Sequence, residues 1–236
     1  MTEWEWCQCA DPIRLLAYLN RPQGDRKLLL YAVACCREHQ HHLRHAVSRD
    51  AIEWAARFAD GDVDRDEESH RLEWASEGAA YECETSLARE HVADWVESGA
   101  RESGASLRHL HGRIAARRHS ATHAAYFANA LLSLDTTDPF DPTLSRHERL
   151  LSVEPLRDIF GNPFRPVACD PAWRTDTAVS LATQMYETRE FGAMPILADA
   201  LQDAGCDNPD ILNHCRDTSL PHVRGCWVID LLTGRG

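Results

Sequence analysis

The chain has 236 residues and a formal net charge of −12 at pH 7. This length allows one sizeable core or two small ones, and a surface of this sign repels phosphate backbones, so nucleic acid is not an expected partner. No apolar run approaches the roughly 20 residues that span a bilayer, and the first residues lack the basic region and apolar core of a signal peptide. We therefore expect a cytoplasmic protein without a membrane partner, in which most of the nine cysteines are reduced.

Helix-capping residues mark the starts of three predicted helices near the N-terminus: Asp11 followed by Pro12, Asp25, and Ser48. The second helix is expected at residues 26–44, and its nearly continuous apolar run makes it central to an N-terminal core. Gly61 ends the third helix, because glycine tolerates the left-handed conformation found at helix C-termini. These three elements predict a compact helical unit.

The middle of the chain predicts further amphipathic helices and then a linker. Up to residue 134 the sequence is rich in Ala, Glu and Arg, with apolar residues at helical spacing. The segment 135–142 contains two prolines and three aspartates, a composition typical of a boundary between structured parts. We therefore predict a helical body at residues 1–134, a linker at 135–150 and a C-terminal module at 151–236.

Start and stop signals are dense in the C-terminal module and predict short helices. These signals are Gly161 with Asn162-Pro163, Thr175 or Asp176 as a cap, Pro195, Gly205, and Asn208-Pro209. The apolar run at 226–232 has the composition of a strand, but its setting among helices favours a buried final helix. Since no strand pair or internal repeat is evident, the predicted fold class is mainly α, with a multi-helix body and a small C-terminal module of short helices.

Two sets of motifs resemble a known family. The C-terminal stretches RDIFGNPFRP, DPAW, PILADALQDAGCDNPDILNHCR and HVRGCWVIDLL, together with the N-terminal stretches WCQCADPIRLLAYL and DRKLLLYAVACCRE, resemble modules of a large planctomycete-type bacterial family whose function is unassigned. The resemblance implies a soluble bacterial protein built around these two ends, and it supplies no catalytic residues. Trp4 and Trp6 lie in the polar N-terminal stretch, and we expect them either to anchor helix packing or to cover the C-terminal module.

The strongest chemical signal is a cluster of thiol and imidazole side chains near the C-terminus. Cys206, Cys215, His222 and Cys226, with His214 beside Cys215, supply the natural ligands of zinc in the number that a tetrahedral site needs. A chain reversal after Cys215 brings them together and staples a module whose own core is thin. The alternative is that these cysteines are reduced packing residues, because free cysteine is often buried and the spacing is not that of a known zinc finger.

A second cysteine group consists of Cys7, Cys9, Cys35 and Cys36. These thiols bind a metal or act in redox chemistry if the N-terminal stretch lies along the second helix. The favoured interpretation makes Cys35 and Cys36 core residues, because they lie within an apolar helical run.

Histidines at helical spacing suggest a third site. Two pairs of histidines are four residues apart, namely His41 with His45 and His119 with His123. Two Glu-x-x-His sequences also occur, from Glu38 to His41 and from Glu67 to His70. The spacing is that of di-iron bundles, although a solvated polar face explains it as well. No nucleotide-binding or hydrolase motif is present. We therefore predict a non-enzymatic interaction or adaptor protein that binds another protein and carries a structural zinc site, with a metal-dependent enzyme using helix-borne His and Glu residues as the alternative.

Overall fold

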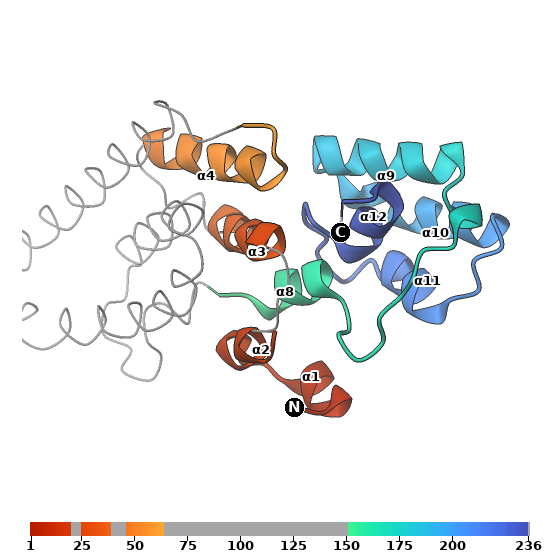
Figure 1. The fold of residues 1–236 in the computed structure, drawn as a ribbon, viewed down its shortest axis with the longest axis horizontal. Coiled ribbons are helices and arrows are strands. Elements are labelled where there is room, and N and C mark those ends of the chain that lie inside the picture. The colour runs from red at the N-terminus through yellow and green to blue at the C-terminus, as the bar shows by residue number, and fades with distance from the viewer. Residues whose placement is uncertain (20–24, 39–45, 64–150, 236) are drawn as a thin grey trace, which may run out of the picture. The chain divides into compact units, whose positions relative to one another are not determined.

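A computed structural model describes residues 1–19, 25–38, 46–63 and 151–235. Every helix or strand element in these ranges is a helix, which confirms the predicted mainly α fold class (Figure 1). The chain divides into two compact units. The terminal unit combines Met1–Asp11 with Val153–Gly236, and the central unit is Pro12–Ser152. The helices predicted between residues 64 and 134 and the linker at 135–150 lie outside the described residues, so that boundary stays a prediction.

The central unit begins with three helices close to the predicted positions: α2 (Pro12–Tyr18), α3 (Asp25–Glu38) and α4 (Ala46–Ala59). Pro12 opens α2, as its fixed backbone angle suits a first helical position. The predicted end of the second helix, at residues 39–44, lies outside the described part of the chain. The prediction that Ser48 caps the third helix is wrong, because α4 already includes it. A serine cap contributes only about 1 kcal/mol, which neighbouring helix-favouring and packed residues override.

Apolar packing joins α3 to α4. The cluster of buried side chains consists of Leu29, Val33, Cys36, Ile52, Ala55 and Ala56, with Trp54, Phe58 and Ala59 packed against it. An ion pair between Arg37 and Glu53, 2.9 Å apart, lies beside the cluster. Gly61 follows α4 with a φ of +75°, which is the left-handed stop that the sequence predicts.

In the terminal unit, the helices of the C-terminal part are α8 (Val153–Phe160), α9 (Asp176–Thr188), α10 (Met194–Asp203), α11 (Pro209–Arg216) and α12 (Trp227–Thr233), with the 3-10 turns η3 (Pro171–Trp173) and η4 (Phe191–Ala193). Thr175 caps α9 by accepting a hydrogen bond from the Ala178 N–H at 3.2 Å. Asn208 caps α11 in the same way, accepting from the Asp210 N–H at 2.9 Å. The last apolar run is a helix, as its setting predicted.

The hydrophobic core of the terminal unit is built by α9 to α12 (Figure 1). Its largest buried side chains include Tyr186, Met185, Met194, Leu197 and Leu201, all about fully buried. Among the described residues, this core cluster includes no side chain of α8. The helix α8 nevertheless buries Leu156 and Ile159 completely, and it adds polar contacts to the other helices through Asp158.

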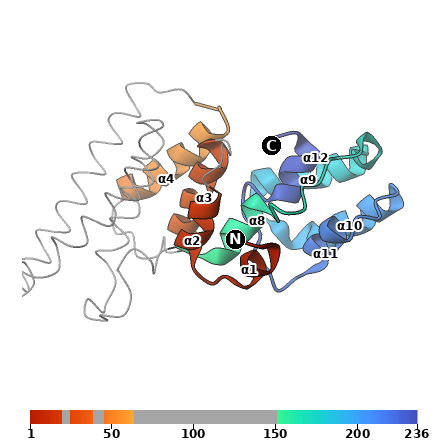
Figure 2. The same cartoon turned by 60° about the horizontal axis from the view of Figure 1, so that its bottom comes forward.

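The N-terminal segment, Met1–Asp11, belongs to the terminal unit, and its helix α1 (Glu3–Gln8) lies next to α8 (Figure 2). Reciprocal hydrogen bonds between Thr2 and Glu5 form a capping box at its start. Trp6 is buried, whereas Trp4 is 73% exposed, and the expected contact of these rings with the C-terminal module stays a prediction. Residues two apart on a helix do not share a face, so only one of these rings can point inward.

Candidate metal centre

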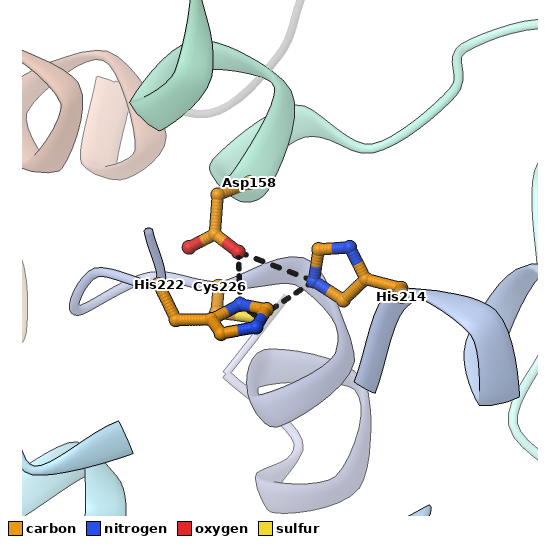
Figure 3. A group of neighbouring side chains, drawn as sticks. All are labelled: Asp158, His214, His222 and Cys226. Carbon is orange, nitrogen blue, oxygen red and sulfur yellow. Dashed lines mark hydrogen bonds and ion pairs between the residues drawn. The ribbon is translucent and has the colours of Figure 1, made fainter. Parts of the chain in front are cut away.

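Four side chains from separate parts of the terminal unit converge on one point: Asp158, His214, His222 and Cys226. We call them the four-donor group. Each offers one ligand atom, and these atoms all lie within 4.8 Å of one another. Figure 3 shows the carboxylate, the two imidazoles and the thiol pointing toward each other. The group is an arrangement of donors that could hold a metal ion.

Each donor is placed by a different piece of local structure. Asp158 lies near the end of α8, His214 lies in the last turn of α11, and Cys226 is the N-cap of α12. His222 lies in the loop between α11 and α12. That loop is tied back by the Val223 N–H, which donates to Asp158 Oδ2 at 2.8 Å. The carboxylate therefore uses one oxygen to hold the loop and the other to face the donors.

The spacing of the donor atoms is close to that of a tetrahedral metal site. Asp158 Oδ1 lies 2.7 Å from His222 Nδ1 and 3.1 Å from His214 Nε2. Cys226 Sγ lies 3.2 Å from His214 Nε2 and 4.0 Å from His222 Nδ1. Zinc bound at its usual bond lengths to N, O and S keeps its ligand atoms about 3.3–3.6 Å apart. Since the ligand atoms lie within 4.8 Å of one another, a central ion requires shifts of about 1 Å or less.

The two histidine nitrogens that face the group each have two partners and at most one hydrogen. His214 Nε2 faces both the carboxylate and the sulfur. If Nε2 carries a hydrogen, that hydrogen serves one of the two well; if it does not, its lone pair faces the carboxylate oxygen. His222 Nδ1 faces the same two partners. A cation at the centre resolves the conflict, because all four atoms then direct lone pairs toward it.

The same geometry differs from a catalytic Cys-His-Asp triad. In a triad the histidine uses one ring nitrogen for the nucleophile and the other for the orienting carboxylate. Here a single nitrogen of His214 faces both Cys226 and Asp158. Cys226 is also 0% exposed, whereas a nucleophilic cysteine is typically partly exposed. The arrangement suits metal binding better than nucleophilic attack.

The electrostatics of the group depend on burial and on its members. Burial by itself raises the pKa of Asp158, but hydrogen bonds and positive charge from His214 and His222 outweigh burial, so the pKa lies below its ordinary value. Burial also raises the pKa of Cys226 well above its ordinary value, and the Asp158 charge adds to this. The backbone N–H groups of Ile229 and Val228 act in the opposite direction. Without a cation, the carboxylate is therefore ionised and the thiol is neutral.

Two of the four residues predicted as zinc ligands lie in the four-donor group, namely His222 and Cys226. The other two, Cys206 and Cys215, lie in the hydrophobic core cluster of α9 to α12. Burial raises the pKa of Cys215 to about 12, as expected for a thiol that packs among apolar side chains. The structure thus places these two thiols where the packing interpretation puts them, whereas their role as ligands stays a prediction.

Sequence reasoning placed His214 only beside the cluster and did not include Asp158 at all. Asp158 is separated from His222 by 64 positions, so no local spacing connects the two. A weak signal exists in α8, where Asp158 stands between the buried residues Leu156 and Ile159. A carboxylate on a buried helical face needs a polar partner, so this pattern marks Asp158 as a candidate site residue.

The remaining sequence hypotheses are not resolved by the structure. Cys7 and Cys9 belong to the terminal unit, whereas Cys35 and Cys36 belong to the central unit, so the second cysteine group stays a prediction. Burial raises the pKa of Cys35 to about 11, as for a packed thiol. The predicted enzyme residues are outside the described residues, apart from Glu38, whose carboxylate accepts a hydrogen bond from Ser152. These outside residues are His41, His45, Glu67, His70, His119 and His123.

No protein-family model, curated protein or solved structure matches this chain. None of the helices in the described part of the chain has both the length and the apolar character that a membrane span requires. The residues of the four-donor group therefore have to carry the functional assignment.

Proposed function

We propose that the four-donor group holds a zinc ion with a structural role, in a non-enzymatic protein that acts by binding another protein. The observation that carries the proposal is the convergence of four donor atoms from α8, α11, the following loop and the start of α12, with Asp158 and Cys226 buried and the two histidines partly buried. Structural zinc sites take four protein ligands, whereas catalytic ones leave a position open for water or substrate. Membership of the planctomycete-type family that the motifs resemble is part of the same proposal.

Donor chemistry favours zinc over other ions. Calcium and magnesium prefer oxygen ligands, and iron–sulfur clusters need several thiolates, whereas zinc accepts carboxylate, imidazole and thiolate together. Charge balance also favours zinc. The two negative charges of the Asp158 carboxylate and a Cys226 thiolate neutralise the two positive charges of the ion, so the buried centre has no net charge. The two imidazoles bind as neutral ligands.

The closed character of the site supports a structural role. The side chains of Asp158, His222 and His214 are 3%, 6% and 12% exposed, and Cys226 is fully buried. An ion at this point links α8 to the loop that carries His222, and residues 217–221 of that same loop are exposed. A metal that fixes such a loop contributes its binding free energy to folding.

An interaction role is supported by two properties of the whole sequence. It contains no nucleotide-binding or hydrolase motif, and its net charge of −12 disfavours nucleic acid as the partner. A second protein is the partner class that remains most compatible with this surface. The alternative, a metal-dependent enzyme, requires an ion with an open coordination position.

Metal analysis of the full-length chain, purified without a histidine tag or chelator, tests the proposal. We expect one zinc per chain. After exchange for cobalt, we expect the absorption bands of a tetrahedral site with a thiolate ligand, unchanged by added azide. A spectrum that shifts with azide indicates an open position and supports the enzyme instead, and protein without stoichiometric metal refutes the site.

A further inference from the structure

The N-terminal segment is attached to the terminal unit chiefly through residues at the end of α8. Arg157 donates from one guanidinium nitrogen to the carbonyls of Trp6 and Cys9, both at 2.8 Å. Just after the helix, the Asn162 side chain donates to the Glu3 carboxylate at 2.9 Å. Arg165 also forms an ion pair with Glu3 at 2.5 Å, but this pair is exposed, and exposed pairs contribute little. Arg157 makes two charge-assisted hydrogen bonds to backbone carbonyls in a partly buried position, so we take it as the strongest polar attachment.

This segment depends on such contacts for its order. Its helix α1 has only 6 residues, and isolated helices shorter than about 12–15 residues are marginal in water. The capping box stabilises its first turn, whereas the carbonyls at its other end rely on Arg157. If α8 moves or frays, α1 loses both the polar partners and the surface that α8 offers it.

The helix α8 buries Leu156 and Ile159 completely, and the four-donor group adds the polar contacts that fix its position against α11 and α12. Within the described residues, α8 contributes no side chain to the core cluster of α9 to α12. Its polar ties to them run through Asp158, which accepts from the Val223 N–H and contacts His214 and His222. Arg157 directly precedes Asp158 in α8. A contact that fixes the position of Asp158 therefore also restrains the position of Arg157.

We propose that metal binding by the four-donor group fixes α8 and thereby docks the N-terminal segment, which is released when the metal leaves. This inference rests on the proposed function, since it requires the ion. Coupling between two binding equilibria is reciprocal. Docking of the segment therefore raises the metal affinity by the same factor by which the metal stabilises docking.

Hydrogen exchange of the full-length protein, with zinc and after chelation, measures the coupling. We expect the amides of residues 1–11 to exchange about ten- to a hundredfold faster without zinc, the effect of losing one or two charge-assisted hydrogen bonds. Amides in α10 report whether the core remains folded in both states. Arg157→Ala should make residues 1–11 exchange fast even with zinc bound, while stoichiometric zinc binding persists with reduced affinity.

Two further variants keep the test decisive. Arg174→Ala removes an exposed arginine of the same unit and should leave the zinc-dependent protection of residues 1–11 intact. If Arg157→Ala fails to fold, Asn162→Ala takes its place, with a smaller but measurable loss of protection. Zinc that binds at one per chain without changing the exchange of residues 1–11 overturns the coupling and leaves the proposed site standing. Absence of zinc binding refutes the site and the coupling together.

Discussion

Cys36 in α3 and Cys226 at the start of α12 are equally buried, with 1% and 0% exposure, and burial raises the pKa of both thiols. They differ in what surrounds the sulfur. Cys36 belongs to an apolar cluster that joins α3 to α4, whereas Cys226 faces His214 at 3.2 Å and belongs to the four-donor group. Burial therefore does not separate a packing thiol from a ligand thiol; the neighbouring donors do.

The helices α3 and α8, one from each unit, also differ in the kind of contact that holds them. α3 is held to α4 by interdigitated apolar side chains, a non-directional contact that tolerates conservative substitution. α8 also buries Leu156 and Ile159, but it is tied in addition by a carboxylate whose oxygens have named partners. Directional contacts of this kind fail when a single group is changed, which gives the comparison several experimental tests.

The largest expected effect comes from Cys226→Ser. We expect loss of stoichiometric zinc and a lower free energy of unfolding, by about 4 kcal/mol when free zinc exceeds the wild-type Kd a thousandfold. Cys36→Ser is the matched control, since it makes the same substitution at an equally buried thiol. It buries a hydroxyl among apolar side chains, at a cost of about 1–3 kcal/mol, but should keep the zinc. Metal analysis and thermal unfolding, each with zinc and with chelator, check both variants. Equal zinc content in the two would show that Cys226 packs as Cys36 does.

The next effect is the pH dependence of zinc affinity. Because the pKa of Cys226 is raised in the metal-free protein, zinc must displace its proton, and affinity falls about tenfold for each pH unit below that pKa. The pKa of the Asp158 carboxyl is lowered, so this group is already ionised at neutral pH and releases no proton when zinc binds. Competition with a zinc-binding dye across neutral pH measures the slope. An affinity independent of pH contradicts thiolate ligation.

A smaller effect is expected from Cys215→Ala, which sharpens the distinction within the terminal unit. Cys215 lies in the core cluster rather than in the four-donor group, so the variant should keep its zinc. The lost sulfur leaves a small void, and we expect a cost of about 1 kcal/mol. Zinc stoichiometry and thermal unfolding check this result. Loss of zinc would restore Cys215 as a ligand, as the sequence prediction had it.

The smallest effect concerns the packing of α8. Gly161 has a φ of +64°, and an added Cβ meets the Trp227 ring at 3.2 Å. Gly205 has a φ of +86° with nothing near its added Cβ. Alanine at either position is strained by about 1 kcal/mol, and the extra loss of stability at Gly161 measures the Trp227 contact alone. Chemical denaturation of both variants gives the difference, and equal losses would mean that the ring moves aside freely.

Much of the fold follows from local sequence signals. Thr175 and Asn208 cap their helices with the hydrogen bonds that their side chains favour, and Gly61 and Gly161 adopt the left-handed conformation at helix ends. Such signals act within a few residues and can be read without knowing the fold. Ser48 shows their limit, because a weak cap preference gave way to helix continuation.

The candidate site was only partly predictable, for a physical reason. His222 and Cys226 are four positions apart, and the sequence prediction includes both in one cluster with Cys206 and Cys215. The thiols chosen to complete the site, Cys206 and Cys215, were chosen because they were near in sequence. The partners that the structure supplies depend on tertiary packing, which brings α8 to the loop from 64 positions away. A ligand contributed by a distant helix leaves no spacing pattern to recognise.

The terminal unit also has a consequence for the order of folding. Arg157 and the Trp6 carbonyl that it binds are separated by 151 positions, with the whole central unit between them. Closing a longer loop adds only about 0.6 kcal/mol for each doubling of its length, so the intervening unit imposes little thermodynamic cost, but contacts between distant residues form slowly. On a ribosome, α1 is made first and must wait for α8 to emerge. The earliest residues of the chain are thus among the last to reach their final contacts.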